Sequence, residues 1–279
     1  MNNRISIHIA NKDRSSELAV LLSSLLRQTF QDFDVVILDD GSGTPVSNFH
    51  FIQKLLTQLK IEGHGVHTER QQYSYGVCKA RNLLLEIDPW KENKYVLRLD
   101  DDVWLEPDYI QRLFDIAESD ENIGIVSGIT PLLGTPQQSI DTKKFNTYFC
   151  NEIVFDDGGN IVRYGDDCGL LYTDSKIVIA HQFRSCALIK RSVLDDNKIR
   201  YELGLTNVGF REEAFLSLRI AWAGMKCIVD TGAIAWHCPA SSGGCRNNDY
   251  QLCVNIDNEH FVKWSKKMFK EKGSPEGFK

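Results

Sequence analysis

The sequence predicts an α/β protein whose central sheet is Rossmann-like, mainly parallel and flanked by helices. Two observations support this fold class: short β-branched apolar runs alternate with helical leucine stripes, and two of those runs end in acidic loops. The 279 residues suffice for one large α/β domain or for two tightly joined halves. Hydrophobic residues make up 42% and charged residues 25%, which is typical of a soluble globular protein.

The N-terminal segment predicts a strand–helix–strand unit. Residues 4–9 alternate and are rich in β-branched side chains, which suits a strand. Ser15 or Ser16 can cap a helix whose leucines recur with the helical period over residues 18–26. Residues 34–38 form a continuous apolar run, typical of a strand covered on both faces, and the crossover between the two strands should be right-handed.

The next elements continue this alternation. Residues 55–59 indicate a helix, residues 65–70 a strand, and residues 76–86 a helix that opens just after a glycine. Residues 95–99 form another strand, closed by the three aspartates of residues 100–102. Two separate strands therefore deliver carboxylates at their C-terminal ends, the edge of an open parallel sheet where ligands bind.

The second half of the chain is less regular. Residues 107–117 indicate a helix and residues 123–127 a strand, whereas residues 130–180 are mixed in character and suit a lid or a hairpin. The remaining expected elements are strands at residues 183–189 and 227–236, a helix at residues 212–223, a Ser/Gly loop at residues 241–244 and a C-terminal tail.

Charge and cysteine usage exclude several classes of function. The formal net charge of −6 disfavours nucleic-acid binding, although a local pocket or a bound cation can still hold an anionic substrate. No segment approaches the ~18 apolar residues of a membrane span, and the N-terminus lacks signal-peptide features. Eight cysteines without a CxxC pair predict reduced, mostly buried thiols and a cytoplasmic location, with peripheral membrane association left open.

Both acidic loops admit a catalytic and a structural interpretation. Asp100 and Asp102 can converge on one Mg²⁺ or Mn²⁺ ion that bridges a diphosphate, or belong to a solvated acidic loop. Asp39 and Asp40 can accept hydrogen bonds from a base or a ribose, or belong to a common Asp-Gly turn. No EF-hand spacing is present.

Further candidates lie at helix starts and at a strand end. Arg81, helped by Lys79, can neutralise phosphate, or be an ordinary surface cation. Glu212 and Glu213 can take a proton from a hydroxyl, or favour the helix N-terminus electrostatically. His237 can be a metal ligand or a core histidine, and the nearby cysteine spacings match no standard zinc site.

Taken in order, these motifs resemble the family 2 glycosyltransferases, the inverting enzymes of the GT-A fold. The resemblance is strong over residues 4–110 and moderate over residues 183–238. The segments that carry it are residues 5–14, residues 25–29 with 35–42, Gly76 with Ala80-Arg81-Asn82, Leu99-Asp100-Asp101-Asp102 with residues 107–109, Glu212-Glu213 with residues 216–219 and 223–224, and Trp236-His237.

The resemblance implies a role for each matching residue. Glu213 would be the catalytic base, with Glu212 as a substitute, because the family more often has an aspartate at the second position. Asp102 and His237 would hold Mn²⁺ or Mg²⁺. The residues implied to bind the nucleotide-sugar are Ala10, Asn11, Arg14, Asp39, Asp40, Arg81, Asp100 and Asp101.

It also implies a division of the chain. Residues 1–105 would form the nucleotide-sugar-binding half and residues 106–245 the acceptor-binding and catalytic half of the same domain, followed by a helical tail over residues 246–279. Acceptor contacts are expected within residues 130–185, where four aromatic side chains can stack on sugars or belong to the core: Tyr148, Tyr164, Tyr172 and Phe183.

The implied activity is transfer with inversion from a nucleotide-diphosphate sugar, with UDP as the default, to a hydroxyl of a glycan or polysaccharide. Residues 10–13 read Ala-Asn-Lys-Asp where the family commonly has Pro-Thr-Tyr-Asn, so the base contacts there differ. The alternatives are an inactive homologue that binds nucleotide-sugars and a sugar-phosphate nucleotidyltransferase. The second is disfavoured because residues 11–14 contain no glycine.

Overall fold

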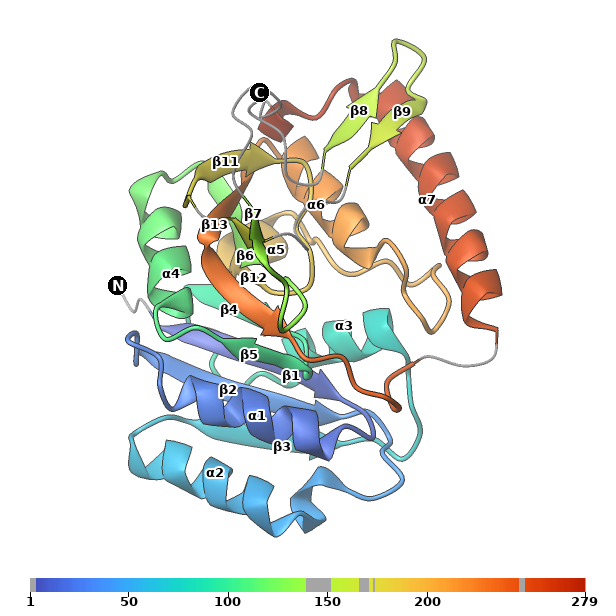
Figure 1. Cartoon of the computed structure of the whole chain (residues 1–279). Helices are drawn as coiled ribbons and strands as arrows, with labels where there is room; N and C mark the ends of the chain where they lie inside the picture. The colour runs from blue at the N-terminus through green and yellow to red at the C-terminus, as the bar shows by residue number, and fades with distance from the viewer. Residues whose placement is uncertain (1–3, 139–151, 166–170, 173, 246–248, 279) are drawn as a thin grey trace.

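The computed structural model describes residues 4–138, 152–165, 171–172, 174–245 and 249–278. Its main feature is a nine-stranded sheet with the order β11-β13-β6-β12-β4-β1-β2-β3, to which β5 adds by pairing with β13 (Figure 1). Helices flank the sheet, so the α/β fold class predicted from the sequence is confirmed.

The N-terminal half is the regular, parallel part of the sheet. Its strands are β1 (Ile5–Asn11), β2 (Phe33–Asp39), β3 (Val66–Arg70) and β4 (Tyr95–Leu99), and every neighbouring pair among them is parallel. Every residue of β2 is buried, as its continuous apolar run predicts. Three helices connect the strands: α1 (Ser15–Leu25), α2 (His50–Ile61) and α3 (Val77–Ile87).

Side chains alternate between two faces along these strands. Ile37 of β2 packs in a cluster with the leucines of α1 and α2, whereas Val36 and Leu38 pack against Ala80 and Leu84 of α3 on the opposite face. The helices therefore cover both faces of the parallel region. The strand ends, and the carboxylates that follow them, are left at one edge.

The start of α1 differs from the sequence-based expectation. Arg14, and neither of the predicted serines, holds the N-cap position, and no side chain caps the helix. The chain turns at Asp13, whose φ is 55°, and the Arg14 carbonyl accepts a hydrogen bond from the Leu18 N–H at 3.0 Å. The early turn directs the Arg14 side chain to the acidic loop after β4, as described below.

The C-terminal half has a mixed sheet. The strand β12 (Ala187–Lys190) runs antiparallel to both β4 and β6 (Ile123–Ile129). The long β13 (Lys226–His237) pairs parallel with β6 and antiparallel with β11 (Ile177–Ala180) and β5 (Val103–Leu105). The helices of this half are α4 (Tyr109–Ser119), α5 (Arg191–Asp196) and α6 (Glu212–Trp222).

One predicted strand is shorter than expected. Residues 183–186 precede β12 instead of belonging to it, and Ser185 has a φ of 59°, which interrupts an extended backbone. This connection leaves the sheet and runs along the cavity described below.

The irregular segment contains short strands where the structure describes it. A hairpin joins β8 (Ile153–Phe155) to β9 (Ile161–Tyr164), and β7 (Gln137–Gln138) pairs with β10 (Leu171–Tyr172). The expected hairpin is therefore present over residues 153–164. Short 3-10 helices lie at η1 (Val46–Asn48) and η2 (Glu276–Phe278).

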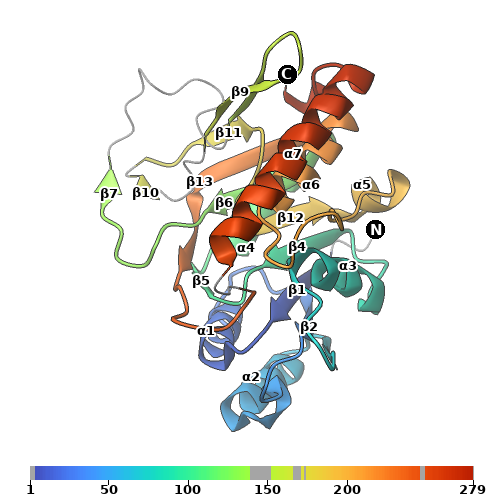
Figure 2. The ribbon, with the colours of Figure 1, turned by 90° about the vertical axis from the view of Figure 1, so that its right-hand side faces the viewer.

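The predicted helical tail is the long helix α7 (Tyr250–Lys272), which crosses α6 (Figure 2). Phe261 and Trp264 of α7 form an aromatic cluster with Phe215 of α6, with ring centroids 5.2 and 4.5 Å from that of Phe215. The helix thus completes a hydrophobic core of its own against α6. None of the helices among the described residues is long and apolar enough to span a membrane.

The cysteines are less buried than predicted. Cys78, Cys186 and Cys227 are buried, whereas the thiols of Cys238, Cys245 and Cys253 are partly exposed. The other two cysteines lie outside the described residues. Burial therefore holds for only half of the described cysteines.

Candidate active site

A cavity of about 370 Å³ opens at the C-terminal edge of the parallel strands. It contains nearly all of the side chains that the sequence singled out, although they come from six separate segments. The predicted residues that line it are Ala10, Asn11, Arg14, Asp40, Arg81, Asp100, Asp101, Asp102, Glu212, Glu213 and His237.

Asp39 is the exception, because it does not line the cavity. Its carboxylate accepts hydrogen bonds from the backbone N–H groups of Ser42 at 2.9 Å and Val46 at 3.0 Å, and Arg70 lies 3.5 Å away. Only 1% of its surface is exposed. Asp39 therefore stabilises the loop after β2, as expected from the interpretation of this motif as an Asp-Gly turn.

Asp40 orders the opposite side of the same loop. Its carboxylate accepts from the Ser74 hydroxyl at 2.7 Å and from the backbone N–H groups of Tyr75 and Gly76 at 2.8 and 3.2 Å. Gly76 has a φ of 81°, and a Cβ there would lie 2.8 Å from Asn207 Cα. Only glycine fits this close approach, which starts α3 and directs Arg81 to the cavity.

The first loop and the acidic loop after β4 are joined by Arg14 and Asn11. Arg14 Nη1 lies 3.0 Å from Asp101 and 2.8 Å from Asp102, and Asn11 Nδ2 donates to Asp101 at 2.8 Å. Burial raises the pKa of Asp101 to about 7, against the opposing charge of Arg14. The three-aspartate loop is therefore compensated by side chains from the end of β1.

A second loop covers Arg14 from the far end of the chain. Gly244 donates its N–H to the Lys12 carbonyl at 2.9 Å. A Cβ at Gly243 would lie 2.7 Å from the Asp13 carbonyl oxygen. The two glycines of the Ser/Gly loop thus permit a backbone contact that side chains would block.

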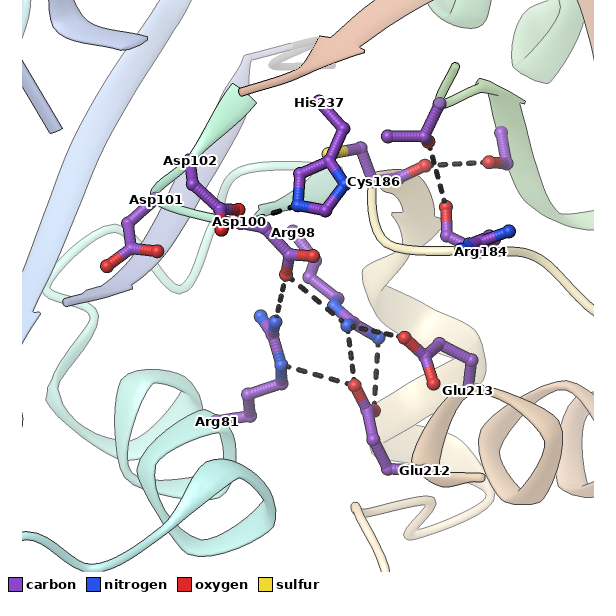
Figure 3. A network of polar contacts seen from close by, with 12 residues as sticks. Arg81, Arg98, Asp100, Asp101, Asp102, Arg184, Cys186, Glu212, Glu213 and His237 are labelled. Carbon is purple, nitrogen blue, oxygen red and sulfur yellow. Dashed lines mark hydrogen bonds and ion pairs between the residues drawn. The ribbon is translucent and has the colours of Figure 1, made fainter. Parts of the chain in front are cut away.

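Asp102 and His237 meet at the candidate metal position. His237 Nε2 lies 3.4 Å from Asp102 Oδ2, and the antiparallel pairing of β13 with β5 places His237 opposite Val103, the residue after Asp102 (Figure 3). Across the part of the chain that the structure describes, no cluster of three or more His, Cys, Asp or Glu side chains can hold a metal. Two protein ligands nevertheless suit a hard cation that completes its shell with phosphate oxygens and water.

A charged network forms the floor of the cavity between α3, β4 and α6 (Figure 3). Arg98 Nη2 lies 2.5 Å from Glu212, 3.1 Å from Glu213 and 3.5 Å from Asp100. Arg81 Nη2 lies 2.5 Å from Asp100. Although burial opposes it, the charges of Arg81 and Arg98 hold the pKa of Asp100 well below its usual range, so this carboxylate stays ionised.

Arg98 was missed by the sequence analysis, which treated it as part of a strand. Its side chain is only 3% exposed, and it contacts all three carboxylates of the network. The sequence does contain a signal for it, an arginine within the otherwise apolar run of residues 95–99. A cation in a buried strand needs carboxylate partners, which predicts a charged cluster beside it.

The network separates the roles of the two glutamates. Arg98 contacts both carboxylate oxygens of Glu212, whose side chain is 3% exposed, and burial raises the pKa of Glu212 to about 8 despite that cation. The Glu213 side chain is 25% exposed and meets Arg98 through Oε1. Of the two, Glu213 is open to a molecule in the cavity, and Glu212 is occupied by its partners.

The remaining wall comes from the C-terminal half. Tyr164 and Phe183, two of the aromatic residues expected to contact an acceptor, line the cavity. Tyr148 and the side chain of Tyr172 lie outside the described residues. Wall residues that the sequence analysis did not identify are Lys12, Gln182, Arg184, Phe210, Arg211, Cys245 and Tyr250.

Comparison with known proteins identifies the class. The sequence profile of glycosyl transferase family 2 matches residues 6–197, more than half of the chain. The chain therefore belongs to glycosyl transferase family 2, as the resemblance of its motifs indicated.

A curated relative and several solved structures agree with this class. Chondroitin synthase of Escherichia coli is 28% identical over 145 residues, covering 52% of this chain but only 18% of the relative. GalNAc-T7 with UDP, GalNAc and Mn²⁺ has a TM-score of 0.67 at 14% identity, covering 98% of this chain and 55% of the other.

Two more structures share the fold. A mannosyltransferase from Pyrobaculum calidifontis in complex with GDP-Man and Mn²⁺ has a TM-score of 0.62 at 12% identity. The match covers 100% of this chain and 70% of the mannosyltransferase chain. S. aureus TarS with UDP-GlcNAc has a TM-score of 0.59 at 12% identity, with coverages of 93% and 66%. At these identities the structural likeness shows the GT-A fold alone.

Proposed function

We propose that this glycosyltransferase transfers a sugar with inversion from a nucleotide-diphosphate sugar, by default a UDP-sugar, to a hydroxyl of a saccharide acceptor. One observation carries the proposal: the partly exposed carboxylate of Glu213 and the Asp102–His237 pair line the same cavity. An in-line displacement needs a base and a stabilised leaving group on opposite sides of one carbon atom.

The donor occupies the edge of the parallel strands in this proposal. Asn11, Arg14 and Asp40 lie there, with Ala10 and Asp101, and are assigned to the nucleotide. Asp39 contributes by ordering the loop after β2, because its own carboxylate is occupied. Asp100 and Arg81 are assigned to the ribose and pyrophosphate side.

Asp102 and His237 are assigned to Mn²⁺ or Mg²⁺, which suits their carboxylate and imidazole donors. When bound, this ion supplies positive charge for the departing diphosphate. GalNAc-T7 and the Pyrobaculum mannosyltransferase were each solved with Mn²⁺, which supports metal dependence here. Arg14, whose Nη1 lies 2.8 Å from Asp102, orients that carboxylate.

Glu213 is the base. It accepts the proton of the acceptor hydroxyl as that oxygen bonds to the anomeric carbon and the bond from this carbon to the diphosphate oxygen breaks, which inverts the configuration. Arg98 fixes Glu213 through Oε1, and Glu212 holds Arg98 in place. Free thiols such as Cys78 and Cys186 favour a reducing compartment, so we keep the cytoplasm as the proposed location.

Nucleotide screening tests this function. We expect a UDP-sugar with Mn²⁺ to raise the melting temperature more than either ligand alone, because a ligand that binds only the folded state stabilises it by mass action. Calorimetry with UDP and Mn²⁺ and a donor-hydrolysis assay follow. Absence of any nucleotide binding would refute the proposal, whereas binding without turnover under all donor and acceptor combinations would make the chain an inactive homologue.

A further inference from the structure

Arg211 adopts a backbone conformation that its side chain disfavours. It is the N-cap residue of α6, directly before the two glutamates, with φ 74° and ψ 8° in the left-handed region. Non-glycine residues take this conformation at a cost, and they keep it where surrounding contacts impose it, commonly at functional sites.

The contacts that impose it come from α7 and from the hairpin. Asn258 Oδ1 accepts from Arg211 Nε at 3.1 Å. The guanidinium carbon lies 3.6 Å from the centroid of the Tyr164 ring and 4.5 Å from that of Phe210. The guanidinium is thus held against one aromatic ring and beside a second, within the cavity wall.

The loop that carries Arg211 is anchored from below. Asp257 of α7 is fully buried and accepts from the Thr206 N–H at 2.6 Å, the Thr206 hydroxyl at 2.9 Å and the Phe210 N–H at 2.8 Å. Two consecutive residues of α7 therefore fix the loop and the guanidinium. These contacts hold both the backbone and the guanidinium of Arg211 in place, unlike those of a flexible side chain on the surface.

The charge of Arg211 has no carboxylate partner among the described residues. Arg14, Arg81 and Arg98 line the same cavity, and each forms ion pairs with carboxylates. Within the described part of the chain, the Arg211 side chain donates to the neutral amide oxygen of Asn258, and its guanidinium lies against the Tyr164 ring. Arg211 lies two residues before the proposed base and has no counter-charge in the described ranges, so the N–H donors of its guanidinium other than Nε can bind an anion.

We propose that Arg211 binds an anionic group of the acceptor saccharide, the carboxylate of a uronate or a phosphate ester. The planar guanidinium fork matches both groups through paired hydrogen bonds. Its place at the start of the helix that carries Glu213 puts it on the acceptor side, away from the strand ends assigned to the nucleotide. This inference rests on the proposed function, because it specifies the acceptor class of the same cavity.

Direct binding of simple glycosides tests the inference independently of turnover. The probes are methyl β-glucuronide, glucose 6-phosphate and methyl β-glucoside, titrated by saturation-transfer NMR in the presence of UDP and Mn²⁺ and in their absence. We expect one of the two anions to bind about 10- to 100-fold more tightly than the neutral glycoside, the range of a hydrogen bond to a charged group. Which anion is preferred identifies the source of the charge.

Variants separate recognition from a structural role. Arg211→Gln should remove the preference for the anion and leave glucoside binding unchanged, whereas Arg163→Gln, on the same hairpin as Tyr164 but outside the cavity, should keep it. Arg211→Gly should lose the preference while keeping or raising the melting temperature, because glycine relieves the left-handed backbone.

Three results would overturn the inference. These are equal or absent binding of the anions relative to the glucoside, an unchanged preference in Arg211→Gln, or a collapse of the melting temperature in Arg211→Gly. The UDP titration on the same proteins is a separate readout. A wild type that prefers the anion but binds no nucleotide would refute the proposed function and leave the anion site standing.

Discussion

The two walls of the cavity are built in different ways. On the side proposed for the donor, Asn11 ends β1, and Asp40 and Asp102 follow β2 and β4. These strands are neighbours in the sheet, so strand pairing alone brings the three residues together. On the acceptor side, Arg211 and Glu213 depend on a loop fixed by α7. Backbone pairing positions the first wall, and individual side-chain contacts position the second.

The largest effect is expected for Glu213→Gln, which keeps the shape of the side chain and removes its basicity. Turnover should fall by about 10²- to 10⁴-fold, the usual contribution of a general base, with the affinity for UDP and Mn²⁺ unchanged. A donor–acceptor transfer assay measures this, with Glu259→Gln on the exposed face of α7 as the control. Near wild-type transfer by Glu213→Gln would show that the base is elsewhere.

Arg98→Met tests the floor shared by both walls. Above pH 8, where the Glu212 carboxylate is ionised, removing this cation leaves a buried charge without its main partner, so the free energy of unfolding should fall by about 3–5 kcal/mol in chemical denaturation. The double variant Arg98→Met with Glu212→Gln should recover part of the loss, because the buried carboxylate is then neutral. Strictly additive effects in this double-mutant cycle would mean that the two side chains do not interact.

Asp257→Asn tests whether α7 fixes only the acceptor wall. It disrupts a buried acceptor of three hydrogen bonds, so the free energy of unfolding should fall by about 1–3 kcal/mol. The acceptor KM should rise while the affinity for UDP stays constant, as measured by steady-state kinetics and calorimetry. Asp115→Asn, on the exposed surface of α4, is the control, and an equal loss of UDP affinity in Asp257→Asn would contradict the separation of the walls.

The smallest effect concerns His181, which connects the hairpin to the C-terminal segment. Its Nδ1 lies 2.8 Å from the Ile153 nitrogen, its ring stacks on Phe278 with centroids 3.8 Å apart, and burial lowers its pKa to about 4. In the unfolded chain His181 is protonated below pH ~6.5, whereas in the folded chain it is protonated only below about pH 4. The free energy of unfolding therefore falls as the pH falls through that window.

From pH 7 to pH 5 this loss should amount to about 2 kcal/mol. Denaturation of the wild type and of His181→Gln at both pH values isolates the contribution, because the other titrating groups are common to the two proteins. A variant with the same pH dependence as the wild type would show that His181 does not titrate differently on folding.

The difference between the walls also explains what the sequence could predict. The strand-end rule placed Asp40 and Asp102 in one region, the family resemblance added His237, and the structure puts all three on one cavity. The same rule included Asp39, but it could not show that nearby backbone N–H groups occupy this carboxylate. The hydrophobic periodicity of a sequence locates helices and strands, but it does not show where each polar side chain at their ends points.

The second wall left few signals in the sequence. Asp257 and Asn258 lie in a polar helix that suggested only a tail, and their roles depend on a loop some 50 residues away. The predicted start of β12 was too early, because Ser185 has a positive φ and leaves the extended conformation. A serine in the sequence does not predict that conformation. Such contacts arise from tertiary packing, and no local pattern encodes them.

The loop of Gly243 and Gly244 that covers Arg14 has a consequence for the order of folding during synthesis. Lys12 and Gly244 are bonded at 2.9 Å, yet 232 positions separate them in the chain (244 − 12). A ribosome-bound nascent chain that has already paired β1 with β2 and β4 lacks His237 until β13 has emerged, and it lacks the cover until Gly243 and Gly244 follow. The cover over Arg14 and the Asp102–His237 pair are therefore completed only late in translation.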